Sequence, residues 1–129
     1  MKNPVALTVA SLLSILFMTF HLTDDILYHG GMGPIQFTAS VLIPVVWLYG
    51  AVVLAGRPSG YIIVGLLSLL TLSVPIVHIM GAGGAIDGGI AKSGVPFFFI
   101  WTLMALSITA TFSLLLSLLG LSTLRRGNL

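Results

Sequence analysis

The side chains that could do chemistry are concentrated in one short stretch of this sequence. The segment HLTDDILYHGGM, residues 21–32, holds two of the three histidines and two of the three acidic residues in a chain of 129 residues. Imidazole and carboxylate groups bind transition metals and exchange protons near neutral pH, and imidazole also ligates haem iron. The third histidine, His78, lies near the end of a later apolar stretch, and the third acidic residue, Asp87, follows it.

The polar residues of this segment share one face if a helix continues through position 29. At ~100° per residue they fall within an arc of roughly 140°, and they are His21, Asp24, Asp25, Tyr28 and His29. Asp25 is four residues from His21 and four from His29, and side chains at this spacing are neighbours on a helix. The spacing therefore predicts one polar site on one side of the helix.

A transition-metal site is the first chemistry that this arrangement suggests. Its ligands would be His21, Asp25, His29 and His78. Imidazole and carboxylate suit Zn, Fe or Cu, and the thioethers of Met32 and Met80, beside two of the histidines, would favour copper. Three further residues would surround the ligands, where they could orient them or carry protons: Asp24, Tyr28 and Asp87.

Three alternatives use the same groups differently. A non-covalent haem b could be held between His78 and either His21 or His29, since the chain has no cysteine for covalent attachment. Histidine–aspartate pairs could instead transfer protons. The groups could also mark only where helices leave a membrane, which requires no function.

The composition of the rest of the chain predicts an integral membrane protein. The chain is 57% hydrophobic and 6% charged, whereas soluble domains carry roughly 25% charged residues. Four apolar runs cover residues 4–29, 35–55, 61–80 and 95–120. About 20 residues span a hydrocarbon core of ~30 Å. We therefore expect an all-α, up-down bundle of four transmembrane helices, with residues 1–129 as a single transmembrane domain.

Basic residues predict the orientation. Four of the five fall in segments that alternate onto one side: Lys2, Arg57, Arg125 and Arg126. Only Lys92 falls on the other side. Because cytoplasmic loops are enriched in Lys and Arg, both termini should be cytoplasmic in a multi-pass protein of the inner cell membrane. Every histidine and aspartate would then lie at the extracytoplasmic boundary.

Small polar residues recur along two of the predicted helices. One series is Ser68, Thr71, Pro75 and His78, and the other is Thr102, Thr109, Ser113 and Ser117. Such residues let transmembrane helices pack closely and hydrogen-bond, and they could alternatively line a polar pathway. No charged residue lies near a helix midpoint, which argues against an ion pump.

The sequence is compatible with three functions. The first is a small membrane-embedded binding protein or redox accessory that holds a metal or haem. The second is a structural or assembly subunit of a larger membrane complex, and the third is an oligomeric small-solute transporter. The expected partners are the lipid bilayer and either further copies or other membrane subunits. Nucleic acid is not expected, and enzymatic activity would require the metal site, because no nucleophile–base arrangement is visible.

Overall fold

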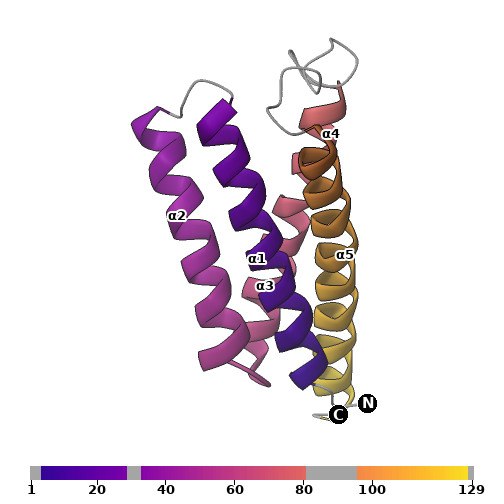
Figure 1. Ribbon diagram of the computed structural model, residues 1–129. Helices are drawn as coiled ribbons and strands as arrows, with labels where there is room; N and C mark the ends of the chain where they lie inside the picture. Colours follow the sequence, from indigo (N-terminus) through magenta and orange to yellow (C-terminus); the bar gives the residue numbers. More distant parts are fainter. Residues whose placement is uncertain (1–3, 29–32, 81–95, 128–129) are drawn as a thin grey trace.

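The regular structure in the described part of the chain is entirely helical (Figure 1). The computed structural model describes residues 4–28, 33–80 and 96–127. Its elements are α1 (Pro4–Tyr28), α2 (Pro34–Leu48), the π-helix η1 (Tyr49–Val53), α3 (Pro58–Thr71), α4 (Ser73–Met80) and α5 (Pro96–Gly127). Four helical stretches, with α2 joined to η1 and α3 to α4, are long and apolar enough to cross a membrane. The prediction of four such helices is confirmed.

Each of the four long helices begins at a proline: Pro4, Pro34, Pro58 and Pro96. Proline is favoured at the first helical position, because the N–H that it lacks would have no partner there. The far end of α5 differs from the prediction, since the helix continues past residue 120 to Gly127. Gly120 does not end the helix, and the ring of Tyr61 packs against its backbone.

The third long helix is interrupted near its middle. α3 ends at Thr71 and α4 begins at Ser73. Pro75 explains the break, because proline has no N–H for the carbonyl of Thr71 and its ring collides with that carbonyl in a regular helix. The interruption lets α4, which carries His78, take a direction of its own.

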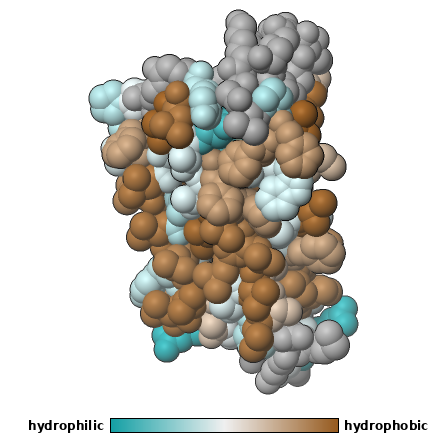
Figure 2. All heavy atoms as spheres, in the orientation of Figure 1, coloured by the Kyte–Doolittle hydropathy of each residue, from teal (hydrophilic) through white to brown (hydrophobic). Residues whose placement is uncertain are grey.

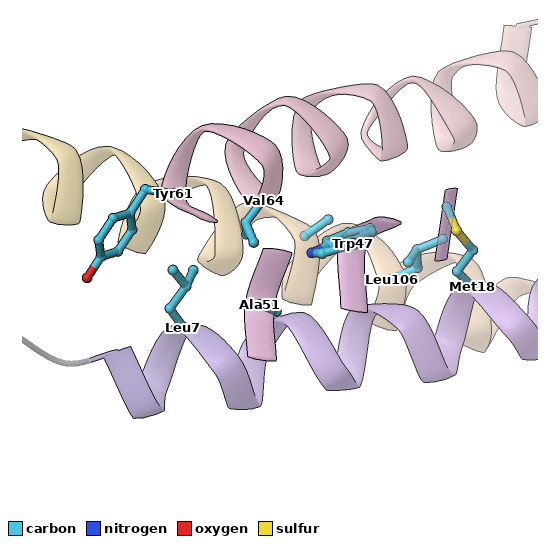
Figure 3. Packing of buried hydrophobic residues seen from close by; sticks show 8 residues of the cluster. Leu7, Met18, Trp47, Ala51, Tyr61, Val64 and Leu106 are labelled. Carbon is cyan, nitrogen blue, oxygen red and sulfur yellow. The ribbon is translucent and has the colours of Figure 1, made fainter. Parts of the chain in front are cut away.

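Buried positions recur at alternating spacings of three and four residues, as in coiled-coil packing. They include Leu7, Ser11, Ser14, Met18 and His21 of α1, Tyr61, Val64, Ser68 and Thr71 of α3, and Phe99, Leu103, Leu106, Ala110, Ser113 and Ser117 of α5. Six of the apolar members form one cluster with Trp47 and Ala51 of the second long helix (Figure 3): Leu7, Met18, Tyr61, Val64, Leu106 and Ala110. Polar groups thus occupy much of the interior, while hydrophobic side chains dominate the middle of the visible surface (Figure 2).

α1 begins and α5 ends at the same end of the bundle, here named the terminal end (Figure 1). Close backbone contacts hold the helices together at this end. A Cβ at Gly60 would lie 2.9 Å from the carbonyl oxygen of Gly50 and still closer to that of Leu54. Glycine is therefore required at the start of α3, where the chain returns from η1.

We expect Gly60→Ala to destabilise the protein by about 1–3 kcal/mol, the usual cost of overpacking. The clash is with backbone, which cannot move aside as a flexible side chain would. Thermal unfolding in detergent should show a lower Tm for Gly60→Ala. Gly127→Ala is the matched control, because a Cβ there meets nothing within 4 Å. Equal Tm values for the two variants would contradict this packing.

Candidate metal centre

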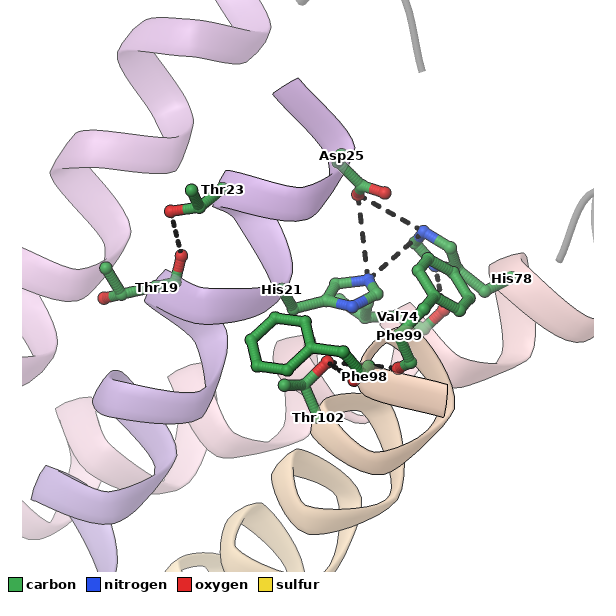
Figure 4. A network of polar contacts seen from close by, with 9 residues as sticks. All are labelled: Thr19, His21, Thr23, Asp25, Val74, His78, Phe98, Phe99 and Thr102. Atoms are coloured by element: carbon green, nitrogen blue, oxygen red, sulfur yellow. Dashed lines mark hydrogen bonds and ion pairs between the residues drawn. The ribbon is translucent and has the colours of Figure 1, made fainter. Parts of the chain in front are cut away.

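Three of the predicted residues meet at the end of the bundle opposite the terminal end (Figure 4). His21 and Asp25 lie one turn apart near the end of α1, and His78 projects toward them from α4. We name this group the His–Asp–His triad. The helical spacing brings the first two together, and the break before Ser73 allows the third to approach.

The ligand atoms of the triad form a small triangle. His78 Nε2 lies 3.3 Å from His21 Nε2 and 3.3 Å from Asp25 Oδ2, and the third side, from His21 Nε2 to Asp25 Oδ2, is 3.7 Å. The centre of such a triangle is about 2.0 Å from each atom, within the range of Zn–N and Zn–O bonds. A tetrahedral ion with bonds of this length holds its ligand atoms roughly 3.3–3.4 Å apart. The triad therefore has the dimensions of one face of a metal site.

Backbone and aromatic contacts fix the orientation of the imidazoles. His78 Nδ1 lies 2.9 Å from the carbonyl oxygen of Val74 and donates its proton to it, so that Nε2 faces the triad. A hydrogen bond from the outer nitrogen to a backbone carbonyl is how proteins commonly orient metal-binding histidines. The ring of Phe99 packs on both imidazoles, with centroid distances of 4.9 Å to His21 and 5.4 Å to His78.

The triad is closed on the core side and partly open on the other. His21 and Phe99 are buried, whereas the side chains of Asp25 and His78 are 19% and 24% exposed. An ion could reach the three ligand atoms from the side of Asp25 and His78. The rings of His21 and Phe99 lie on the side of the bundle core and lower the local polarity there, which strengthens electrostatic interactions within the site.

The other predicted site residues fall outside this triangle or outside the described residues. Asp24 is buried one position before Asp25, and Tyr28 is exposed at the end of α1. Met80 is 73% exposed and thus gives no support to a copper site with a thioether ligand. Three residues lie outside the described ranges: His29, Met32 and Asp87. The roles of His29 and Asp87 stay predictions.

Phe99 and Val74 were not among the predicted site residues. Val74 could have been found from sequence, because it precedes His78 by four residues and a helical histidine can bond to that carbonyl. Phe99 belongs to the aromatic start of α5, where three consecutive phenylalanines give no indication of which one faces the core. Only the packing of α5 against α1 selects it.

The arrangement of the two imidazoles suits a single ion better than a haem. Two histidines that ligate one haem lie on opposite faces of the porphyrin, with the macrocycle between them. Here the Nε2 atoms are 3.3 Å apart and the rings meet edge to face, with centroids 4.6 Å apart and planes at 74°. A macrocycle could not enter between these rings without separating α1 from α4.

No protein-family model matches this chain, and neither a curated protein nor a solved structure is detectably similar to it. No activity, substrate or ligand can therefore be transferred from a relative.

Acidification should weaken metal binding at the triad. A protonated imidazole or carboxylic acid has lost the lone pair that would ligate the ion, so protons and metal compete for the same atoms. We expect the Zn²⁺ affinity, measured by competition with a chromophoric chelator in detergent, to fall steadily between pH 7.5 and pH 5.5. An affinity that is constant over this interval would show that histidine does not bind the ion.

Proposed function

We propose that this chain is a small integral membrane protein that binds one transition-metal ion through the His–Asp–His triad. The observation that carries the proposal is the triangle formed by two imidazole nitrogens and one carboxylate oxygen. Its sides of 3.3, 3.3 and 3.7 Å bring all three ligand atoms within bonding distance of one point. Four apolar helices of membrane-spanning length support placement in a bilayer.

The ligand set favours a borderline divalent ion. Two imidazoles and one carboxylate, without sulfur, suit Zn²⁺ or Fe²⁺ better than Cu⁺, which prefers soft thiolate and thioether ligands. Two histidines and one carboxylate also form the three-ligand set of many non-haem iron and zinc centres. Three protein ligands leave a coordination position for water or another small ligand. The partial exposure of Asp25 and His78 supports an open position on that side.

The distribution of basic residues supports an extracytoplasmic position for the site. Most of the basic residues belong to segments that alternate onto the side of the terminal end, with Arg125 and Arg126 in the last turn of α5. The enrichment of cytoplasmic loops in basic residues supports a cytoplasmic terminal end. The triad would then lie at the extracytoplasmic face of the inner membrane. Its role would be to receive, hold or present a metal ion there.

A subunit role is the second candidate, and the packing of α2 favours it. No residue from Pro34 to Val46 is buried, although Trp47 and the following turns pack tightly against α1 and α3. Half of one long helix thus contacts little of its own chain. In a bilayer this half could pack against a second copy or another membrane subunit. Such a role is compatible with a metal site.

Metal binding can be tested on the purified protein. We expect one Zn²⁺ or Fe²⁺ per chain by mass spectrometry of metals. Removal of a group that only orients a metal ligand lowers metal affinity by roughly 10–100-fold. Replacement of a ligand itself should lower the affinity for the metal ion by more than this, and the variants to test are His21→Ala, Asp25→Asn and His78→Ala. Thr23→Val is the control, because its hydroxyl bonds to the Thr19 carbonyl on an exposed face.

Two outcomes would reject the proposed site. One is the absence of stoichiometric binding of Zn²⁺, Fe²⁺, Mn²⁺ or Cu²⁺ by the folded wild-type protein. The other is wild-type affinity in the variant that lacks both histidines of the triad, His21 and His78. A Soret band lost from this double variant would favour haem instead.

A further inference from the structure

Hydroxyl side chains on the outside of the bundle bond to their own helices. Each donates to a carbonyl three or four residues earlier, and they include Thr19, Thr23, Thr38, Ser40, Thr111 and Thr123. This is the expected behaviour where no other acceptor is near. The exposed hydroxyls therefore require no hydrogen-bond acceptor outside their own helices.

Several polar groups inside the bundle behave differently. The hydroxyls of Ser11, Ser68 and Thr71 and the indole N–H of Trp47 are fully buried and have no protein partner among the described residues. A buried polar group without a partner costs about 1–3 kcal/mol. Each hydroxyl could have bonded to its own helix, as the exposed ones do. In a core without water, these hydroxyls would be expected to make that bond.

Contacts between α1 and the second helix place two of these groups at one level. Thr8 Oγ1 donates to the carbonyl of Ala51 over 2.9 Å. One helical turn farther from the terminal end, α1 presents Ser11 and the antiparallel α2 presents Trp47. Both side chains are fully buried. They therefore face the same part of the interior.

A second contact adds α3 to this level. A Cβ at Gly50 would lie 3.6 Å from a methyl group of Val64, so these two residues are neighbours. One turn farther from the terminal end lie Trp47 on α2 and Ser68 on α3. The unpartnered indole N–H and the unpartnered Ser68 hydroxyl thus belong to adjacent helices at the same height.

A third contact closes the layer through α5. A Cβ at Gly65 would be 2.8 Å from Ser117 Oγ, which places Ser68 beside Ser113 one turn farther along. Ser113 Oγ in turn lies 3.5 Å from Ser14 Oγ of α1. All four long helices thus contribute to a mid-bundle polar layer, which consists of Ser11, Ser14, Trp47, Ser68 and Ser113.

We propose that the mid-bundle polar layer binds ordered water. Water can both donate to a hydroxyl oxygen and accept from the indole N–H, so one ligand satisfies both kinds of unpartnered atom. A cation is a poor alternative, because the layer has no charged side chain and Trp47 offers only a donor. The ligand is therefore a small neutral molecule that donates and accepts hydrogen bonds.

We expect the ordered water to continue from this layer along α3 toward the triad, as a water column. Thr71, one turn beyond Ser68, adds a third unpartnered hydroxyl. Its carbonyl cannot accept the usual helical bond, because residue 75 is proline. Thr71 is two turns before His78. The column gives protons an aqueous approach to the triad through a region without charged side chains, and it does not depend on a bound metal.

The two tryptophans provide a direct test in phosphatidylcholine nanodiscs. Trp47 is fully buried, whereas Trp101 is 47% exposed and pairs with Phe17 on the outside of the bundle. If water occupies the core, brief radiolytic hydroxyl-radical labelling should modify Trp47 faster than Trp101, which lipid shields. In Trp101→Phe protein, the emission of Trp47 should shift to shorter wavelength when Ser68→Ala and Thr71→Val are added.

The matched control is Thr111→Val, which removes an exposed hydroxyl already bonded to Ser107 and should leave the emission unchanged. Labelling of Trp47 no faster than that of Trp101 would overturn the proposal. So would an emission maximum that is the same with and without Ser68→Ala and Thr71→Val. A Zn²⁺ titration of this double variant should match wild type, so failure of the water layer is distinguishable from failure of the metal site.

Discussion

The position of the Asp25 carboxylate constrains the end of the bundle that holds the triad. A carboxylate in a largely apolar environment is tolerated only with compensating partners, and Asp25 has the imidazoles of His21 and His78 within 3.7 Å and 3.3 Å. The first comes from the preceding turn of the same helix. The second comes from α4, which follows the interruption at Pro75. Phe99 then covers both rings from the core side.

Contacts in the rest of the bundle align the helices that carry the triad. Near the terminal end, glycines allow close contacts between helices. The backbone of Gly60 packs against the carbonyl groups of Gly50 and Leu54, and the ring of Tyr61 packs on Gly120. Such contacts fix the relative heights of the helices. They thereby determine which polar groups meet farther along the bundle. The relative positions of the helices along the bundle axis therefore determine the close packing at the terminal end, the mid-bundle polar layer and the triad.

The sequence predicted the helices and two parts of the site for clear physical reasons. Apolar runs of membrane-spanning length predicted the four helices, and the four-residue spacing predicted that His21 and Asp25 are neighbours. Up-down topology brought His78 to the same end. The break at Leu72 has a local cause in Pro75. The π-helix at Tyr49–Val53 and the choice of Phe99 among three phenylalanines depend on tertiary packing. The prolines at which all four helices begin are a signal that is visible in the sequence.

The most direct test of the central claim is X-ray absorption at the Zn edge on protein loaded with one Zn²⁺ per chain. The triad predicts a first shell of nitrogen and oxygen at about 2.0 Å, with the outer-shell scattering of two imidazoles and no sulfur. Asp25→Asn should change this shell. A shell of water oxygens without imidazole scattering, unchanged when His21 and His78 are replaced, would contradict the account.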